Sequence, residues 1–365
     1  MKTIVFLVTQ LINSGPENVV YNICNNLDRS VYLPIVFSLK SEDPLKSIEN
    51  RFREIGVNII HFDASTMELE LLPRRFSKKI QKGLLDVNCD ILHVHCYHPN
   101  IVGVFIRGIK KITTVHQISG EDFIMKKGVI IGSYMKFRFD NTLKHYDRIA
   151  VLSDYMKEYY KQCNGNIVKI PNGVTNCITG TNIELFRNSI SATRSIPVIL
   201  VTGTLSDRKN VVFLLTELKK SKQLFNCYIL GKGDKYNECL RIIDGDQRFH
   251  LEGFKDNVWD YLGISDIYIS ASKSEGLPMS VLEALSAGIP CLLSNIPPHR
   301  EIAREAKVKG VELFDIKKGA LQEAFDMMLL SKYNHEIIKS SSQKLYSSKR
   351  MTTLYENVYI SCLES

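Results

Sequence analysis

Residues 272–288 read SKSEGLPMSVLEALSAG and combine the signals of a strand end, a loop and a helix start. The preceding segment, DIYISAS, predicts a strand, Pro278 suits the first position of a helix, and Gly288 suits its left-handed end. The loop between them would lie at the carboxyl end of the strand and at the amino end of the helix. Backbone amides there and the helix dipole favour a diphosphate, which predicts an anion site made by Gly276, Leu277, Pro278, Met279 and Ser280.

Two carboxylates flank this predicted anion site. Glu275 lies in the loop and can accept hydrogen bonds from hydroxyls of a group attached to the phosphate. Glu283 lies roughly 7–8 Å further along the helix axis, at about 1.5 Å per residue, and can reach hydroxyls on the other side. One carboxylate for a sugar and one for a ribose suit a nucleotide sugar. The alternative is a pair of solvated glutamates on an ordinary βαβ unit.

The rest of the chain alternates short apolar runs with longer amphipathic stretches, which predicts parallel α/β architecture. A length of 365 residues favours two domains. Helical patterns include 19–29 and 210–223. Expected strands cover 3–10, 32–39, 56–62, 90–96, 111–117 and 148–153 in the first half, and 197–203, 227–231, 249–254, 266–272, 290–295 and 310–315 in the second.

A polar seam at 169–182, with a Pro-Asn-Gly turn cluster, separates the two halves. We therefore expect an N-terminal domain at 1–172, a C-terminal domain at 173–345 and a last helix at 346–365. Two parallel sheets facing each other would form a cleft lined by strand carboxyl ends, where such sheets bind ligands.

Composition narrows the class of protein. No run approaches the roughly 18 apolar residues of a membrane span. The first fifteen residues have some features of a signal peptide, but they lack a clean cleavage site and also suit a buried strand. Nine scattered cysteines without a CxxC pair favour neither a zinc site nor a disulfide framework, which indicates a reduced, cytosolic protein.

The net charge of +8 is concentrated in the first half, where 23 Lys and Arg face 17 Asp and Glu over residues 1–175. Two basic segments with apolar neighbours contribute, at 73–82 and 126–138. Such segments suit an anionic membrane surface, although a solvated helix face has the same pattern. Nucleic acid is a poorer partner, because no binding motif accompanies the modest pI of about 8.9.

The stretch from Glu275 to Glu283 closely resembles the E-x7-E signature of the retaining glycosyltransferases of family 4, which have the GT-B fold of two facing Rossmann-like domains. The resemblance implies that Glu275 contacts the transferred sugar and that Glu283 contacts the nucleotide ribose. VTGTLSDRKN (201–210) is similar to the family's phosphate loop. Lys209 fits its lysine, whereas Thr204, after Gly203, stands where arginine is usual.

Further matches cover most of the chain. Arg208 can substitute for the missing arginine from a neighbouring position. LGKGD (230–234) resembles the family's Gly-x-Gly turn, and IPNGV (170–174) resembles its hinge between domains. By the same resemblance, Phe254 and Lys255 are candidate neighbours of the base. The last helix commonly crosses back to the first domain in this fold.

The first half is similar to the family at two places. Ser14 and Gly15 stand where a Gly-Gly loop opens the first helix, and a small loop there lets acceptor and donor approach closely. TTVHQ (113–117) resembles a strand ending in Thr-x-His, which makes His116 a candidate to contact the sugar or the reacting oxygens. The other reading of His116 is a structural histidine at a strand end.

A metal hypothesis arises from His93, His95 and His98, because His93 and His95 would share one strand face. The family resemblance implies metal independence instead, with no cofactor and no metal site.

We therefore expect a retaining, metal-independent hexosyltransferase with Glu275, His116 and Lys209 as catalytic residues. The donor would be a UDP-hexose or UDP-N-acetylhexosamine, with GDP-mannose next. The acceptor would be a glycan or a lipid-linked glycan of lipopolysaccharide or capsule synthesis, used at the inner face of the cell membrane by a peripherally attached cytoplasmic protein. The alternatives are a UDP-sugar epimerase of the same fold, a non-catalytic partner subunit and, third, a nucleic-acid-binding protein.

Overall fold

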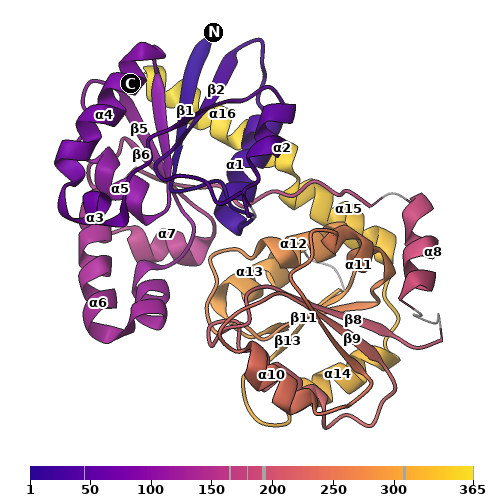
Figure 1. Ribbon diagram of the computed structural model, residues 1–365. Helices are drawn as coiled ribbons and strands as arrows, with labels where there is room; N and C mark the ends of the chain where they lie inside the picture. Colours follow the sequence, from indigo (N-terminus) through magenta and orange to yellow (C-terminus); the bar gives the residue numbers. More distant parts are fainter. Residues whose placement is uncertain (45, 164–165, 179, 191–194, 307–309, 365) are drawn as a thin grey trace. The chain divides into compact units, whose positions relative to one another are not determined.

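The computed structural model describes residues 1–44, 46–163, 166–178, 180–190, 195–306 and 310–364 (Figure 1). Two compact units divide the chain. Unit 1 comprises Met1–Gly173 and Ser348–Ser365, and unit 2 comprises Val174–Ser347. Both units are layered α/β structures, which confirms the predicted fold class. No helix in the described part of the chain is long and apolar enough to cross a lipid bilayer.

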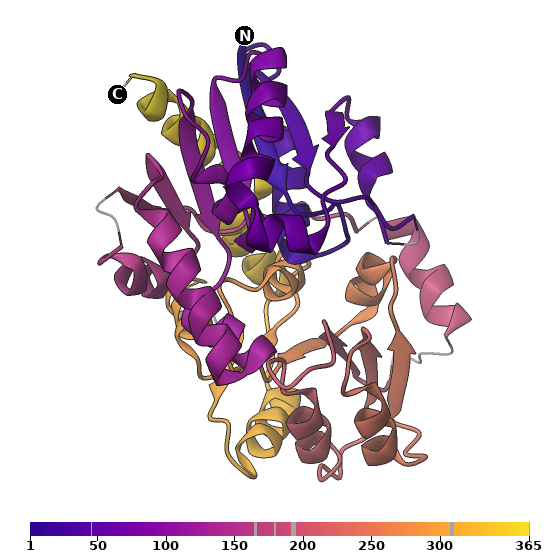
Figure 2. The ribbon, with the colours of Figure 1, turned by 60° about the vertical axis from the view of Figure 1, so that its left-hand side comes forward.

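Unit 1 contains a seven-stranded parallel sheet in the order β3-β2-β1-β4-β5-β6-β7 (Figure 2). The N-terminal segment is an interior strand, β1, paired in parallel with β2 on one side and β4 on the other. The elements are β1 (Lys2–Val8), α1 (Gly15–Asn26), β2 (Tyr32–Ser38), α2 (Glu49–Glu54), β3 (Asn58–His61), α3 (Thr66–Leu71), α4 (Pro73–Asp86), β4 (Ile91–His95), α5 (Tyr97–Gly103), β5 (Lys110–Val115), α6 (Ser119–Leu143), β6 (Arg148–Val151), α7 (Asp154–Tyr160), β7 (Ile167–Lys169) and α16 (Ser348–Glu364).

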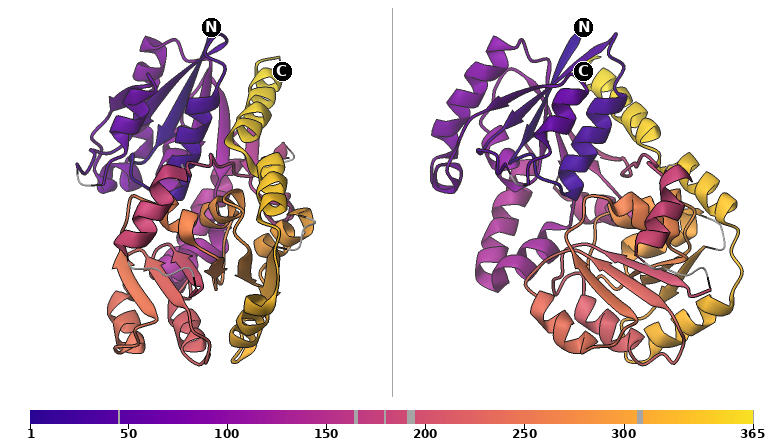
Figure 3. Two further views of the ribbon diagram at one scale, coloured as in Figure 1. Left: turned by 90° about the vertical axis from the view of Figure 1, so that its right-hand side faces the viewer. Right: turned by 45° about the vertical axis from the view of Figure 1, so that its right-hand side comes forward.

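Unit 2 contains a six-stranded parallel sheet in the order β10-β9-β8-β11-β12-β13, with helices on both faces (Figure 3). Its buried core is formed mainly by aliphatic side chains of these strands and of α9 and α14. The elements are α8 (Gly180–Ser189), β8 (Val198–Thr202), α9 (Val211–Leu218), β9 (Asn226–Leu230), α10 (Tyr236–Ile243), β10 (Phe249–Gly253), α11 (Val258–Ile264), β11 (Ile267–Ser270), α12 (Met279–Ser286), β12 (Cys291–Ser294), α13 (Pro297–Ala306), β13 (Val311–Phe314), α14 (Ala320–Leu330) and α15 (His335–Tyr346).

The last helix, α16, packs against α1 in unit 1. Its buried tyrosines reach the sheet, because the hydroxyl of Tyr359 lies 2.9 Å from Nδ1 of His93. The hydroxyl of Tyr355 lies 2.9 Å from Oγ1 of Thr114 on β5. The last helix is therefore joined to β4 and β5 by polar contacts inside the core of unit 1.

All twelve predicted strands occur, but the sequence reading missed β7 and misplaced two helices. β7 has only three residues, all half-buried, which gives too short a pattern to detect. α1 begins at Gly15 rather than residue 19, with Pro16 in its first turn. α9 ends at Leu218 rather than residue 223. Arg248 donates to the carbonyl oxygens of Lys219 and Ser221, at 3.1 and 2.6 Å, where the helix has ended.

Candidate active site

Each sheet has one point at which the strand order reverses, and parallel sheets bind ligands at the carboxyl ends of the strands there. In unit 2 this point lies between β8 and β11. The loop after β8 (203–210) and the loop after β11 (271–278) therefore share one edge of the sheet. These loops carry most of the residues that were expected to bind a donor.

Glu275 is the centre of the group in unit 2. Its side chain is buried, with the residue only 4% exposed. Oε1 accepts hydrogen bonds from Nζ of Lys209 at 2.6 Å and from Oγ of Ser272 at 2.8 Å. Oε2 accepts one from Nη1 of Arg208 at 2.9 Å, and the same nitrogen donates to the carbonyl oxygen of Ser274 at 2.9 Å. Two cations thus converge on one buried carboxylate.

The charge state of Glu275 follows from these contacts. Burial raises its pKa, but the charges of Lys209 and Arg208, with hydrogen bonds from Lys209 and Ser272, hold the pKa well below its usual range. The group is therefore a carboxylate at any physiological pH. A ligand that draws the two cations toward its own negative charge leaves an ionised acceptor beside it.

The helix start beside Glu275 differs from the prediction by one residue. Pro278 is the N-cap, and α12 begins at Met279. Because proline has no backbone N–H, Pro278 cannot donate to an anion, so the expected set of amides loses that member. The first amides of the helix, from Met279 and Ser280, have no acceptor within it. Gly288, at a φ of +84°, ends the segment as predicted.

Close packing of glycines explains part of the phosphate-loop pattern. A β-carbon on Gly231 would lie 1.9 Å from the carbonyl oxygen of Gly203, and one on Gly233 would lie 2.2 Å from that of Leu205. A β-carbon on Gly203 would meet the Lys209 side chain at 3.2 Å. The Gly-x-Gly turn after β9 therefore lets the 203–210 loop lie directly against it, which positions Lys209.

The remaining predicted donor residues lie further out. Thr204 is exposed, and Glu283 is half-buried on α12. Phe254 is exposed after β10, which is two strands from β8, and Lys255 forms an ion pair with Glu252 at 2.9 Å. The geometry brings Arg208, Lys209 and Glu275 together; the roles of the other four stay predictions.

His299 is a residue that the sequence reading missed. It is fully buried on α13, and its Nδ1 lies 2.9 Å from the carbonyl oxygen of Ser294. Because a carbonyl oxygen only accepts, Nδ1 carries the proton, and Nε2 presents a lone pair that has no partner among the described residues. Burial lowers the pKa of His299 to about 4, against the opposing charge of Glu275. A lone histidine after a strand gave no signal in the sequence.

In unit 1 the predicted acceptor-side loop forms the start of α1. Ser14 is the N-cap and Gly15 the first helical residue. The hydroxyl of Ser14 donates to the carboxylate of Glu17. Glu17 is buried, and burial raises its pKa to about 6. The spacing of Ser14 and Glu17 is that of a capping box, a pattern that could have singled out Glu17.

His116 follows β5 and is partly exposed. Its Nε2 lies 2.9 Å from Nδ1 of His95, which is buried at the end of β4. His93, on the same strand, contacts His95 with ring centroids 4.3 Å apart and bonds to Thr114 at 2.8 Å. Burial lowers the pKa of His93 and of His116 to about 3, so this row of histidines is neutral at physiological pH.

Comparison with known proteins decides the family. The family model described as "Glycosyltransferase Family 4" matches residues 13–175, and the one described as "Glycosyl transferases group 1" matches residues 182–345. Between them the two models span almost the whole chain. The chain belongs to glycosyltransferase family 4.

This glycosyltransferase is similar to enzymes of surface-polysaccharide synthesis. The O-antigen biosynthesis glycosyltransferase WclY of Escherichia coli is 23% identical over 98% of this chain and 97% of the relative. The Escherichia coli UDP-Gal:alpha-D-GlcNAc-diphosphoundecaprenol alpha-1,3-galactosyltransferase is 24% identical over 57% of this chain and 58% of the relative. The crystal structure of Anabaena HepE in complex with UDP-glucose has the same fold, with a TM-score of 0.80, 14% identity and coverage of 99% of this chain and 100% of that one.

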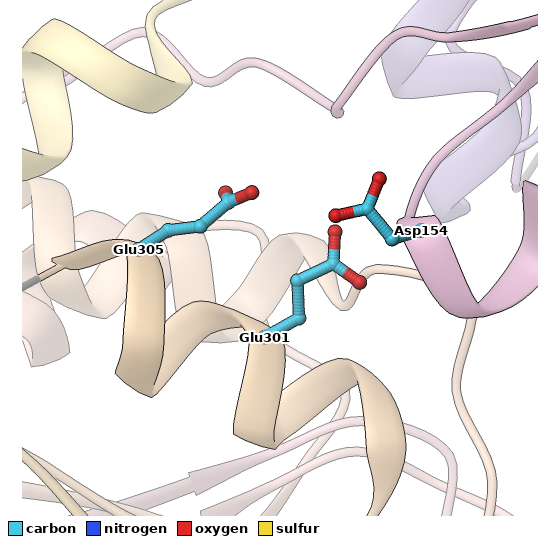
Figure 4. A group of neighbouring side chains, drawn as sticks. All are labelled: Asp154, Glu301 and Glu305. Atoms are coloured by element: carbon cyan, nitrogen blue, oxygen red, sulfur yellow. The ribbon is translucent and has the colours of Figure 1, made fainter.

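Within each unit of the glycosyltransferase, the possible metal ligands among the described residues are dispersed. His98 does not join His93 and His95, since its Nε2 lies 3.1 Å from Oε1 of Glu70. Figure 4 draws two glutamates, Glu301 and Glu305, one turn apart on α13, with Asp154 of unit 1. Within either unit, no three described His, Cys, Asp or Glu side chains gather as a metal site. Metal independence stays a prediction.

Proposed function

We propose that this glycosyltransferase transfers a hexose or an N-acetylhexosamine from a UDP-sugar to a glycan or lipid-linked acceptor in cell-surface polysaccharide synthesis. The observation that carries the proposal is the convergence of Lys209 and Arg208 on Glu275 beside the amino end of α12. The printed functions of the O-antigen and diphosphoundecaprenol relatives support the acceptor class. The UDP-galactose and UDP-glucose of the relative and of the structural neighbour support the nucleotide.

Lys209 and Arg208 would hold the diphosphate of the donor. Their charges are balanced by the carboxylate of Glu275, so a bound diphosphate would compete with Glu275 for the two cations. The amides at the start of α12 add donors aimed at the same place. Charge built up on the departing diphosphate is then stabilised without a metal ion, which is our proposal for the metal independence of the reaction.

When the diphosphate has broken one of its two ion pairs, Glu275 would accept hydrogen bonds from hydroxyls of the sugar. Glu283 would accept hydrogen bonds from hydroxyls of the ribose. His116 would contact the sugar or the reacting oxygens. We propose retention by same-face displacement: the bond from the anomeric carbon to the phosphate oxygen breaks, and the bond to the acceptor oxygen forms on that face. The proton of the acceptor hydroxyl passes to the departing phosphate oxygen. Capture of a covalent glycosyl-enzyme intermediate would contradict this route.

The first test is thermal shift and sugar-nucleotide hydrolysis with UDP-, GDP- and ADP-sugars in the presence of EDTA. We expect one donor class to stabilise the wild type and to be hydrolysed slowly. Glu283→Ala is expected to lose that response, whereas Glu323→Ala, an exposed glutamate on α14, keeps it. A response that appears only when a divalent metal ion replaces EDTA would contradict metal independence.

The same assay separates the two alternatives. A UDP-sugar epimerase of this fold would convert the donor to its epimer without any acceptor, which chromatography of the nucleotide sugars detects. A non-catalytic partner subunit would show no response to any donor while remaining folded. For the protein as a whole we propose a cytoplasmic location with peripheral attachment to an anionic membrane, where a lipid-linked acceptor is found.

A further inference from the structure

Helix α6 is a hairpin of two helical arms rather than one rod (Figure 1). Gly128, with φ of +75° and ψ of 173°, breaks it into segments 119–127 and 129–143. A β-carbon on Gly132 would lie 2.6 Å from the α-carbon of Ile124, so the arms touch backbone to backbone just behind the turn. Gly128 is required by its positive φ, and Gly132 is required by the close approach of the two arms. The two glycines therefore specify the hairpin.

The tip of this hairpin is apolar and exposed. Val129, Ile130 and Ile131 follow the turn and are 70%, 87% and 56% exposed. Tyr134 and Phe137, further along the same arm, are exposed by more than half. Single exposed apolar side chains are common on proteins, but a contiguous group of this kind indicates an interaction surface.

Polar contacts hold the hairpin against the rest of unit 1. Oγ of Ser119 donates to Asp140 at 2.6 Å, which joins the two arms. Nη1 of Arg138 donates to Glu70 of α3 at 2.6 Å, in a pair that is mostly buried. The arm that carries the apolar tip is thus fixed to the carboxyl end of α3.

The surface next to this attachment has the same character. Met67 in the first turn of α3, Leu71 at its end and Leu72 directly after it are exposed apolar side chains. Helix α4 begins directly afterwards and buries Phe76 and Ile80. Its solvent side carries a row of exposed cations: Arg74, Arg75, Lys78, Lys79 and Lys82. Among the described residues none of these cations forms an ion pair, so the row favours an anionic partner.

We propose that the α6 tip and the α3–α4 surface together dock unit 1 on an anionic lipid bilayer. Val129, Ile130 and Ile131 enter the boundary between head groups and acyl chains, and the cations of α4 lie at the head groups. Long aliphatic side chains at a tip, aromatic side chains behind them and a basic face alongside match this interface. The inference rests on the proposed function, in the case where the acceptor is lipid-linked.

The two parts of the surface are expected to be necessary together. A few aliphatic side chains alone give weak, reversible binding, and each cation near an anionic surface strengthens binding about fivefold at low salt. Binding should therefore need anionic lipid, weaken as salt screens the charges, and fail without the apolar tip.

The test is sedimentation of the full chain with vesicles of phosphatidylcholine, alone or with 30% phosphatidylglycerol. We expect binding to the anionic vesicles only. The triple variant Val129→Ser/Ile130→Ser/Ile131→Ser and the triple variant Lys78→Gln/Lys79→Gln/Lys82→Gln should each weaken binding at least tenfold. The matched control is Met327→Ser/Leu330→Ser, which removes two exposed apolar side chains from α14 of unit 2 and should bind as the wild type does.

A variant with a single substitution at the tip tests the proposal even if the triple variants fail to fold. Ile130→Trp in a Trp259→Phe background places the only tryptophan at the tip. Its emission should shift to the blue with anionic vesicles and stay unchanged with neutral ones. No shift, or equal binding by the tip variant and the wild type, would overturn the proposal.

Two further outcomes are decisive. If the tip substitutions change a dimer into a monomer and leave vesicle binding intact, the surface joins two copies of the chain and the membrane proposal is wrong. Thermal shift with UDP-sugars on the same variants keeps the two proposals apart. Vesicle binding without any donor response would contradict the proposed glycosyl transfer and leave the docking surface standing.

Discussion

Nζ of Lys209 lies 2.6 Å from Oε1 of Glu275, although 66 positions separate the two residues in the chain. The contact arises because their loops follow β8 and β11, which are neighbours in the sheet. A cation expected to hold phosphate and a carboxylate expected to hold sugar are thus paired with each other. If Lys209 holds the donor as we propose, donor binding exchanges this contact for contacts with the phosphate.

Replacing Glu275 with glutamine should therefore affect stability and activity together. Glu275→Gln leaves Lys209 and Arg208 half-buried without their counter-charge, and breaking a buried ion pair in this way costs about 3–5 kcal/mol. We expect the urea midpoint of unit 2 to fall and turnover to drop at least a hundredfold. Asp315→Asn, which removes an exposed carboxylate paired with Lys317, should change neither. Normal turnover by Glu275→Gln would exclude its predicted role.

Thr204 offers a test by gain of function. It is exposed and stands where the family usually has arginine, so the resemblance predicts a missing cation. Thr204→Arg should lower the KM for the donor about fivefold, the effect of one exposed charge pair of about 1 kcal/mol. Thr204→Gln supplies length and hydrogen bonds without charge and should leave KM unchanged. Equal KM values for all three proteins would show that Arg208 already does this work or that no cation is needed.

The sequence could predict the fold because the apolar runs that form strands are local, and all twelve expected strands occur. β7 escaped prediction because three half-buried residues carry no periodicity. From the sequence, Glu275 and Lys209 could be assigned to one site only through the family resemblance. Their pairing depends on the strand order and on the rotamers that burial allows. Neither can be predicted from the neighbouring residues in the sequence.

Residues with no local signature could not be predicted at all. His299 enters the neighbourhood of Glu275 only after β12 is placed next to β11. The contact between His95 and His116 spans two adjacent strands, and their tautomers depend on which atoms each ring meets. His93 and His95 could be assigned to one face from their spacing. The contacts of His93 with the buried tyrosines of α16 could not be predicted, because these tyrosines lie far away in the chain.

The glycines behind the phosphate loop provide a steric prediction. Gly231→Ala would place a β-carbon 1.9 Å from the carbonyl oxygen of Gly203, at a φ of +145°. We expect a loss of about 3 kcal/mol or more in the free energy of unfolding, from overpacking and backbone strain together, and a loss of donor binding as the Lys209 loop moves. Gly245→Ala, at a φ of +71° in open space, should cost only about 1 kcal/mol and keep donor binding. Equal effects of the two changes would contradict this.

The neutral histidines of unit 1 should make it sensitive to acid. Burial holds the pKa of His93 and of His116 near 3, below the usual 6.5, so the unfolded chain binds these protons first as the pH falls. Stability that is present above pH 6.5 is then lost by about 1.4 kcal/mol per pH unit for each histidine. Glu17 acts in the opposite direction between pH 4.5 and about 6, because its folded pKa is raised. His93→Gln should remove about one proton from the slope of unfolding free energy against pH, measured by urea unfolding; an unchanged slope would show that His93 is not protected.

The ring of His95 should determine which nitrogen of His116 carries the proton. Nε2 of His95 is buried without a partner among the described residues, and a buried lone pair costs less than a buried orphan N–H, so the proton belongs on Nδ1. Nδ1 then donates to Nε2 of His116, which places the proton of His116 on its other nitrogen, ready to donate to a sugar oxygen.

Nitrogen-15 NMR of the imidazoles measures this directly, because protonated and unprotonated ring nitrogens have different shifts. In the wild type we expect His116 to be a single tautomer with the proton on Nδ1. His95→Leu should leave His116 as a mixture of both tautomers. We expect kcat to fall with little change in KM, because the imidazole of His116 is still present but its proton is no longer held on Nδ1. His299, whose Nδ1 is held by the carbonyl oxygen of Ser294, is the internal reference and should keep its proton on Nδ1 in both samples. A mixed His116 in the wild type, or the same single tautomer without His95, would show that His95 does not control it.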